Sequence, residues 1–230
     1  MKTTALIVAA GAGVRMGRPR PKAFLSLCGL RVVEYSLAAF DEHPLVDGII
    51  LMVPEPMLTE AAEVAARFRK VAAVAAAAAL GLDTVQLGLN HAGDADLILV
   101  HDAARPLVDR DLISRVIEAA ARTGAAIPGV RPRDTIRKEP EPVAGEHRMG
   151  AGTHDRNGLV LVQTPQGFRL SLLREAAAAA GGVEVTDDAM LVEMMGCPVE
   201  VVEGSRRNFK LTTPDDLIFA SALLAPGRKA

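Results

Sequence analysis

The sequence predicts an α/β protein with a mainly parallel sheet, and two observations support this. Short apolar runs, each long enough for one buried strand, alternate with longer segments whose apolar residues recur at helical spacing. This alternation is typical of βαβ units, in which a helix connects two parallel strands. A length of 230 residues suits one domain, 1–230, that buries a sizeable core.

Six apolar runs are expected to be strands, and seven amphipathic segments are expected to be helices. The strands are predicted at Ala5–Val8, Gly48–Val53, Leu97–Val100, Ala125–Val130, Leu159–Gln163 and Val199–Val202. The helices are predicted at Val32–Phe40, Leu58–Lys70, Thr84–Asn90, Asp111–Arg122, Leu170–Ala180, Asp188–Met195 and Pro214–Leu224. The last helix has proline and two aspartates in its first turn, where both residue types are favourable.

One segment does not follow this alternation. Seven of the ten residues in Val71–Leu80 are alanine, the residue with the highest helix propensity. Intrinsic propensity therefore favours a helix there.

Composition excludes several classes of protein. A net charge of −2 argues against nucleic acid as a partner, because domains that bind it are usually strongly basic. No run is long and apolar enough for a membrane span or a signal peptide, so we expect no membrane partner and a cytoplasmic location. Cys28 and Cys197 lack metal-ligand spacing and are expected to be buried free thiols.

A turn of small residues follows the first predicted strand. It reads Ala9-Ala10-Gly11-Ala12-Gly13, and the cations Arg15 and Lys22 come soon after it. Glycine lets a backbone approach a ligand closely, and N–H groups in such a turn can bind an anion. The spacing matches neither the dinucleotide fingerprint nor the P-loop. The two cations favour a nucleoside triphosphate held at its phosphates, whereas the glycines alone would also fit a tight turn without a ligand.

The motifs resemble one enzyme family along nearly the whole chain. The first motif, together with Pro21-Lys22, is similar to the signature of sugar-phosphate nucleotidyltransferases. The motifs that follow occur in the order seen in 2-C-methyl-D-erythritol 4-phosphate cytidylyltransferases of the non-mevalonate isoprenoid route. They are His101-Asp102-Ala103-Ala104-Arg105-Pro106, Arg133-Asp134-Thr135, Asp155-Arg156-Asn157-Gly158, Thr164-Pro165-Gln166, Thr186-Asp187-Asp188 and Asn208-Phe209-Lys210.

This resemblance implies a Rossmann-like, three-layer nucleotidyltransferase fold with a twisted, mainly parallel sheet. The implied reaction transfers a cytidylyl group from CTP to 2-C-methyl-D-erythritol 4-phosphate and releases pyrophosphate. The nucleophile is already anionic, so catalysis should consist of positioning and electrostatic stabilisation, without a general base. The implied catalytic residues are Arg15, Lys22, Arg156 and Lys210.

Further site residues are also implied by the resemblance. The CTP-binding residues are Ala9, Ala10, Gly11, Ala12, Gly13, Ala77, Ala78, Thr84, Asp102 and Ala103. The residues that bind the polyol phosphate are Asp102, Arg105, Thr135, Arg156, Thr164, Thr186 and Lys210. We expect Mg²⁺ or another divalent cation as cofactor, without a confident protein ligand, because Mg²⁺ on phosphates takes few protein ligands. Asp187 and Asp188 are expected to begin a helix rather than to bind a metal.

The resemblance also implies a β-arm over residues 133–157. In the family this arm hooks around a second subunit, so the resemblance implies a homodimer in which each active site borrows residues from its partner. The residues of Arg131–Asn157, taken without the resemblance, indicate instead a long surface loop, because this stretch is polar and has no helical periodicity.

The chain departs from the family pattern in the alanine-rich segment. The family has a strand there and then a loop with Gly-Gly and Arg, which contacts the cytosine base, whereas this chain has Ala77-Ala78-Ala79-Leu80-Gly81. Two alternatives stay open, and this departure favours only the second of them. One is a cytidylyltransferase for another polyol phosphate, such as ribitol 5-phosphate. The other is a catalytically weakened nucleotide-binding protein.

Overall fold

A single mixed sheet forms the centre of the protein. The computed structural model describes residues 1–11, 20–78, 81–138, 151–180, 185 and 187–225. The strand order is β10-β7-β11-β6-β1-β4-β5, and β12 also pairs with β7. All run parallel except β10 and β11, which confirms the predicted fold class. The strands are β1 (Thr3–Val8), β4 (Gly48–Val53), β5 (Val71–Ala76), β6 (Leu97–Asp102), β7 (Ala125–Val130), β10 (Leu161–Val162), β11 (Gln166–Arg169) and β12 (Glu200–Glu203).

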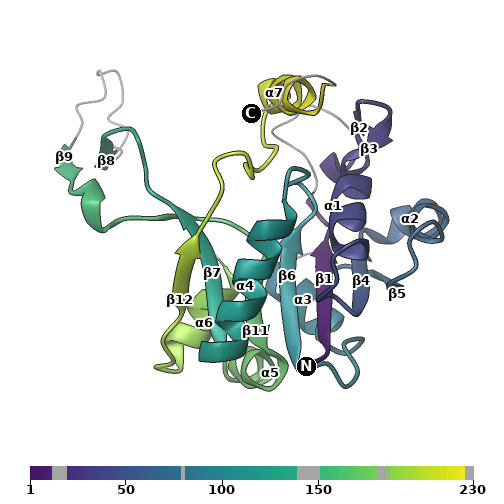
Figure 1. The fold of residues 1–230 in the computed structure, drawn as a ribbon, viewed down its shortest axis with the longest axis horizontal. Helices are drawn as coiled ribbons and strands as arrows, with labels where there is room; N and C mark the ends of the chain where they lie inside the picture. Colours follow the sequence, from purple (N-terminus) through teal and green to yellow (C-terminus); the bar gives the residue numbers. More distant parts are fainter. Residues whose placement is uncertain (12–19, 79–80, 139–150, 181–184, 186, 226–230) are drawn as a thin grey trace, which may run out of the picture.

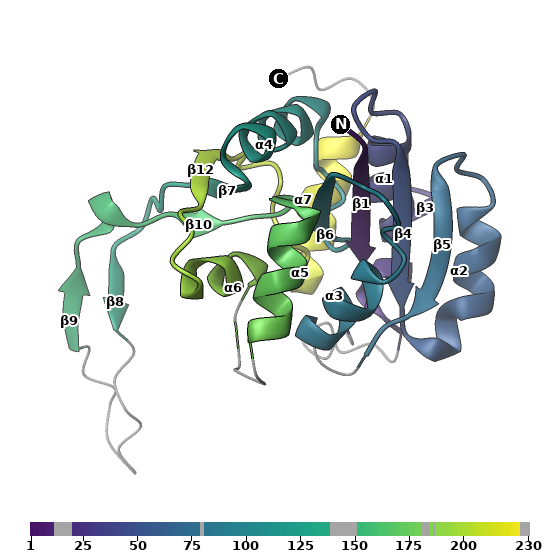
Figure 2. The same ribbon diagram turned by 90° about the horizontal axis from the view of Figure 1, so that it is seen from below.

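Helices cover both faces of this sheet and make three layers (Figures 1 and 2). One face carries α1 (Val32–Asp41), α2 (Leu58–Ala65) and α4 (Arg110–Thr123). The other carries α3 (Gly81–Leu89), α5 (Leu170–Ala179) and α6 (Asp188–Met194). The helix α7 (Pro214–Leu224) lies beyond the carboxyl ends of the strands.

The side chains of β1 show how one strand supplies both cores. Ala5 and Ile7 pack under α1, whereas Leu6 between them packs on the opposite face with α3. All three are fully buried. A strand covered on both faces has no exposed side, so its sequence is a continuous apolar run. This is why the central strands could be recognised without alternation of polar residues.

Most predicted elements are present, some with shifted ends. The strands β4 and β7 and the helix α7 have the predicted bounds. The predicted strand Leu159–Gln163 is wrong in extent, because only Leu161–Val162 pair with β7. The predicted helix to Lys70 ends at Ala65, after which the chain turns into β5. The short strand β11 was not predicted, since Gln-Gly-Phe-Arg is no apolar run, and its pairing between β6 and β7 creates it.

The helix that propensity favours in the alanine-rich segment is wrong. Val71–Ala76 is the edge strand β5, parallel to β4. Val74 packs on one core and Ala73 and Ala75 pack on the other, so tertiary pairing overrides the propensity of alanine. The strand implied by the family resemblance is confirmed.

A small sheet stands away from the main body (Figures 1 and 2). Its strands, β8 (Ile136–Lys138) and β9 (Ala151–His154), pair antiparallel. They lie within the predicted arm, 133–157. The role of this arm in dimerisation stays a prediction.

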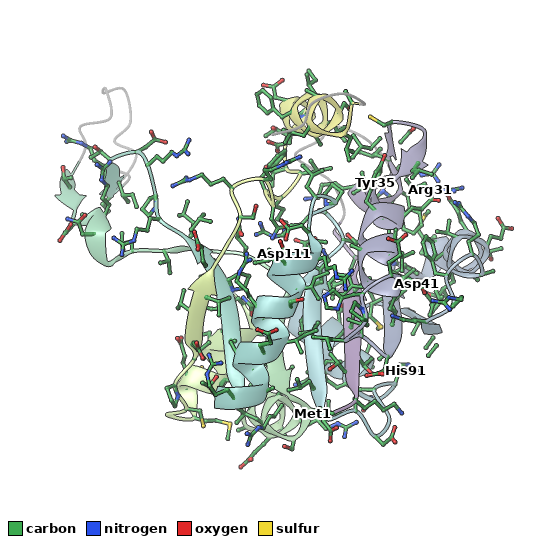
Figure 3. All side chains as sticks on the ribbon, in the orientation of Figure 1. Met1, Arg31, Tyr35, Asp41, His91 and Asp111 are labelled. Carbon is green, nitrogen blue, oxygen red and sulfur yellow. The ribbon has the colours of Figure 1, made fainter. Side chains whose placement is uncertain are left out.

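A hairpin and α1 connect the first half of the chain to α7. The hairpin consists of β2 (Ser26–Leu27) and β3 (Leu30–Arg31). Tyr35 of α1, labelled in Figure 3, donates its hydroxyl proton to the carbonyl of Leu27 at 2.7 Å.

Both cysteines are free, but Cys28 in this hairpin is exposed, so the expectation of burial is wrong for it. Among the described residues, no helix combines the length and apolarity needed to cross a bilayer.

The packing around Gly167 generates a prediction about stability. A Cβ atom at Gly167 would lie 2.8 Å from Cγ1 of Val116 and 3.1 Å from Cβ of Ala120, and both of these residues are fully buried. Gly167→Ala is therefore expected to lower the free energy of unfolding by about 1–3 kcal/mol, because the core is overpacked. Urea denaturation measures this change. Gly158→Ala is the matched control, since nothing lies within 4 Å of its added Cβ; equal effects at both sites would contradict the prediction.

Candidate active site

A cavity of about 450 Å³ opens at the carboxyl ends of β1 and β6. This is the edge at which open α/β sheets bind ligands. Strand ends, the loops after them and the segment before α7 form its wall. The residues that line it are Val8, Ala9, Ala10, Gly11, Lys22, Ala23, Ala78, Thr84, Val85, Val100, His101, Asp102, Ala104, Thr164, Gln166, Val185, Asp187, Asp188 and Lys210.

Lys22 packs over the turn that follows β1. A Cβ atom at Gly11 would lie 3.6 Å from Cε of Lys22, so the lysine stem runs close to the glycine backbone. Only 8% of Lys22 is exposed, and its Nζ donates to the carbonyl of Leu211 at 3.0 Å. This contact fixes an ammonium group on the cavity wall next to the turn.

Asp102 and Lys210 form an ion pair on the wall of the same cavity. The second carboxylate oxygen of Asp102 accepts a hydrogen bond from the N–H of Ala104 at 2.9 Å. Burial alone would raise the pKa of Asp102, but the charge and hydrogen bond of Lys210 outweigh it and hold the pKa below its usual value. Asp102 is therefore ionised at neutral pH and keeps the Lys210 ammonium group at the cavity.

Thr164 presents its hydroxyl to the same cavity. Its Oγ1 accepts a hydrogen bond from the N–H of Asp102 at 3.0 Å and lies 3.1 Å from Nδ1 of His101. The carbonyl of Thr164 accepts a hydrogen bond from the Asn208 side chain at 2.8 Å. Burial lowers the pKa of His101 to about 3, so this histidine is neutral.

Four polar residues of the described cavity wall were not predicted as site residues, namely His101, Gln166, Asp187 and Asp188. Asp187 caps α6 by accepting from the N–H of Met190 at 3.1 Å, as the sequence predicted. Gln166 donates to Asp187 and accepts from the N–H of Ala189, both at 3.2 Å. Burial, and then the charge of Asp187, raises the pKa of Asp188 to about 7. The motifs containing these residues were recognised, but only the fold brings them to the cavity.

The structure brings together about half of the predicted site residues. Those that line the cavity are Ala9, Ala10, Gly11, Lys22, Ala78, Thr84, Asp102, Thr164 and Lys210. Ala12, Gly13, Arg15 and Thr186 lie outside the described residues.

Three predicted residues lie behind the wall. The N–H of Ala77 donates to Val53 at 2.7 Å as a continuation of the sheet. Ala103 is fully buried. Arg105 donates to the carbonyl of Asn208 at 2.8 Å, and burial lowers its pKa. These residues support the lining rather than form it.

Thr135 and Arg156 are far from this lining in the fold. Thr135 is exposed next to β8, and Arg156 is exposed in the short helix η4 (Arg156–Gly158), where it donates to the carbonyl of Arg133. Neither side chain lines the cavity of its own chain.

The described part of the cavity wall has no preformed cation cage. Within the described residues, no group of three or more His, Cys, Asp or Glu side chains could hold a metal ion. Asp102 is the carboxylate beside the lysine of the ion pair, and it could serve as one ligand to a hard cation such as Mg²⁺.

Comparisons with known proteins identify the family. The family model for 2-C-methyl-D-erythritol 4-phosphate cytidylyltransferase (IspD) matches residues 3–226. Enzymes of that name from Geobacillus kaustophilus (strain HTA426) and Syntrophotalea carbinolica are each 41% identical; the alignments cover 98% and 99% of this chain, and 98% of each relative. The crystal structure of the enzyme from Thermus thermophilus superposes on this structure with a TM-score of 0.78 at 40% sequence identity. The superposition covers 97% of this chain and 98% of the Thermus chain.

The raised pKa of Asp188 predicts how stability depends on pH. The folded state binds a proton more tightly than the unfolded state, so this residue destabilises the fold as pH rises from about 4 to about 7. Asp188→Asn should stabilise the protein by about 2 kcal/mol above pH 7, about half of the full shift, because the residue is only partly buried. Urea unfolding at pH 4, 6 and 8 checks this. A gain that is the same at all three pH values would contradict it.

Proposed function

We propose a mechanism for the cavity, and it starts from one premise: the chain belongs to the 2-C-methyl-D-erythritol 4-phosphate cytidylyltransferase family. Its activity is the transfer of a cytidylyl group from CTP to 2-C-methyl-D-erythritol 4-phosphate. The products are 4-diphosphocytidyl-2-C-methyl-D-erythritol and pyrophosphate. The roles of the individual residues and the assembly are proposed below.

The reaction requires positive charge and alignment of the two substrates rather than a general base. A phosphate oxygen of the acceptor forms a bond to the α-phosphorus of CTP, and the bond from that phosphorus to the pyrophosphate oxygen breaks. The attacking oxygen is already anionic, so no proton must be removed. The only histidine on the cavity wall, among the described residues, is neutral and fully buried, which agrees with this.

Lys22 and the turn Ala9–Gly11 hold the triphosphate. Backbone N–H groups of a small-residue turn bind phosphate oxygens, and the fixed ammonium group of Lys22 stabilises the charge that grows during transfer. Arg15, which follows this turn in the sequence, would add a second cation. The observation that carries this proposal is the convergence of Lys22, this turn and Lys210 on one cavity.

Lys210, held by Asp102, binds the acceptor phosphate, and Thr164 contributes a hydroxyl next to this pair. On the other side of the cavity, the backbone of Ala78 and the start of α3 accommodate the cytosine. The hydroxyl of Thr84 donates to the carbonyl of Ala78 at 3.2 Å, which holds the backbone of Ala78 next to the start of α3.

Mg²⁺ fits this site as an ion carried by the phosphates. The described wall offers Asp102 and the neighbouring pair Asp187 and Asp188 rather than a cage of three or more ligands, and Mg²⁺ typically takes only one or two carboxylates beside substrate phosphates. Asp102 is the residue that would hold it. When bound, the ion would neutralise phosphate charge.

We further propose a homodimer in which the arm, 133–157, supplies Thr135 and Arg156 to the partner's cavity. An isolated two-stranded sheet such as β8–β9 is marginally stable in water, so a partner surface would stabilise it. Four consecutive apolar residues at the base of the arm, Leu159–Val162, are exposed by 36–51%. Such a patch on a short edge strand favours contact with a second chain.

A cytoplasmic location is part of the same proposal. It is supported by the two free cysteines, of which Cys28 is exposed. An exposed thiol stays unpaired in a reducing compartment.

The activity is tested by pyrophosphate release from CTP and Mg²⁺ with two acceptors in parallel. Turnover with 2-C-methyl-D-erythritol 4-phosphate should greatly exceed that with ribitol 5-phosphate. Faster turnover of ribitol 5-phosphate would contradict the acceptor assignment. Binding of CTP without turnover of either acceptor would instead support a nucleotide-binding protein.

Removing either proposed triphosphate cation should slow the chemical step. Lys22→Ala and Arg15→Ala should each lower kcat by 100-fold or more, because loss of one transition-state donor costs about 3–4 kcal/mol. Steady-state kinetics measure this. Lys2→Ala removes an exposed lysine that pairs with Asp94 away from the cavity and is the matched control. Near-normal kcat in both active-site variants would refute the assignment.

A mixed dimer tests whether Arg156 acts on the partner's site. If it does, a heterodimer of Lys22→Ala and Arg156→Ala chains has one site with both residues intact and one site without either. Co-expression with two different tags and tandem purification should give about half of the wild-type kcat per dimer, although both homodimeric variants are nearly inactive. An inactive heterodimer would show that Arg156 serves its own chain.

A further inference from the structure

We infer that His101 is a positioning residue, which orients the hydroxyl of Thr164 so that its proton points into the cavity. The inference rests on the proposed function, because that proton would be donated to an oxygen of the acceptor polyol phosphate. His101 is fully buried at the end of β6 and acts through Thr164 rather than by touching the substrate.

Contacts with four residues fix the imidazole ring, and one of them is a hydrogen bond with the backbone of Arg105. Phe40 packs against it with ring centroids 5.0 Å apart and a tilt of 55°. Its Nε2 lies 3.3 Å from Oγ of Ser36 in α1, and its Nδ1 lies 3.1 Å from Oγ1 of Thr164. The ring therefore connects a buried hydroxyl in the core to a hydroxyl on the cavity wall.

His101 is fully buried, and its two ring nitrogens lie within hydrogen-bond distance of the hydroxyls of Ser36 and Thr164, neither of which is charged. Burial away from a counter-charge disfavours the imidazolium, so the ring is neutral and carries one proton. If Nε2 carries it, Thr164 must donate to Nδ1, and the proton of the Ser36 hydroxyl has no acceptor. Ser36 is fully buried, and in the described part of the chain His101 is the hydrogen-bond partner of its hydroxyl, with no second one. A buried donor without an acceptor is costly.

The other tautomer leaves no buried donor unpaired. Ser36 donates to Nε2, and the Nδ1–H of His101 donates to Thr164. Thr164 then accepts two hydrogen bonds, from His101 and from the N–H of Asp102 at 3.0 Å. Both lone pairs of its oxygen are occupied, so its proton must go to an acceptor in the cavity. Phosphate oxygens only accept hydrogen bonds, so a hydroxyl restricted to donation suits them.

Two isosteric substitutions separate this role from packing. The amide nitrogen of Asn can take the place of Nδ1, whereas the amide of Gln reaches only the place of Nε2. His101→Asn should keep kcat/KM for 2-C-methyl-D-erythritol 4-phosphate within about threefold of wild type. His101→Gln should lower it about tenfold or more, as expected for loss of a hydrogen bond to a charged group. Equal kcat/KM for the two variants would overturn the inference.

The same two substitutions made in a Thr164→Val variant, and a control substitution at another buried histidine, distinguish this role from a general loss of folding. In Thr164→Val the hydroxyl is gone, so His101→Asn and His101→Gln should no longer differ. A difference that persists there would contradict action through Thr164.

His43 is a buried histidine remote from the cavity, whose Nε2 contacts the carbonyl of Arg110 at 3.2 Å. His43→Gln should lower the melting temperature without changing kcat/KM.

The tautomer can be measured independently of turnover. Long-range ¹H–¹⁵N correlation spectra of the ¹⁵N-labelled full-length protein show which ring nitrogen of His101 carries the proton. A proton on Nδ1 is expected, and a proton on Nε2 would overturn the inference even in a fully active enzyme. Absence of turnover in the wild type would contradict the proposed function, while the spectrum would still decide the tautomer.

Discussion

The site depends on the parallel pairing of β1 with both of its neighbours. Val8, the last residue of β1, is in register with Met52 of β4 and with Asp102 of β6. Parallel strands end at the same edge of a sheet, so the small-residue turn and the acidic residue must emerge side by side. Slippage of either register would separate the turn from Asp102. The continuous apolar runs of these strands, buried on both faces, stabilise this register.

The segment Asn208–Leu211 contributes Lys210 to the cavity wall and connects parts of the chain that are far apart in sequence. The N–H of Leu211 donates to Ala104 at 2.7 Å, and the carbonyl of Leu211 accepts from Lys22 at 3.0 Å. Asn208 is bonded to both Arg105 and Thr164. Lys210 is therefore placed by backbone contacts on both sides of it, which limits the entropy lost when a ligand binds.

The sequence predicted the strand ends and their motifs well, because these depend on local features. Apolar runs mark β1, β4 and β6, and the chemistry-bearing residues follow them directly. Features made by tertiary pairing were missed. Gln166 reaches the cavity through β11, a strand that exists only because β6 and β7 accept it on both sides. The alanines of β5 have helical propensity, and only the neighbouring strand overrides it.

Within the described residues, three carboxylates lie on the wall of a cavity that must bind anions, and the negative charge of each is offset or reduced in a different way. Asp102 is paired with Lys210. Asp187 accepts hydrogen bonds from the N–H of Met190 and the amide of Gln166, so N–H dipoles offset its charge. Asp188, with a pKa near 7, is about half protonated at neutral pH. The negative charge on the wall is thus largely offset, and the ammonium group of Lys22 beside the turn favours phosphate there.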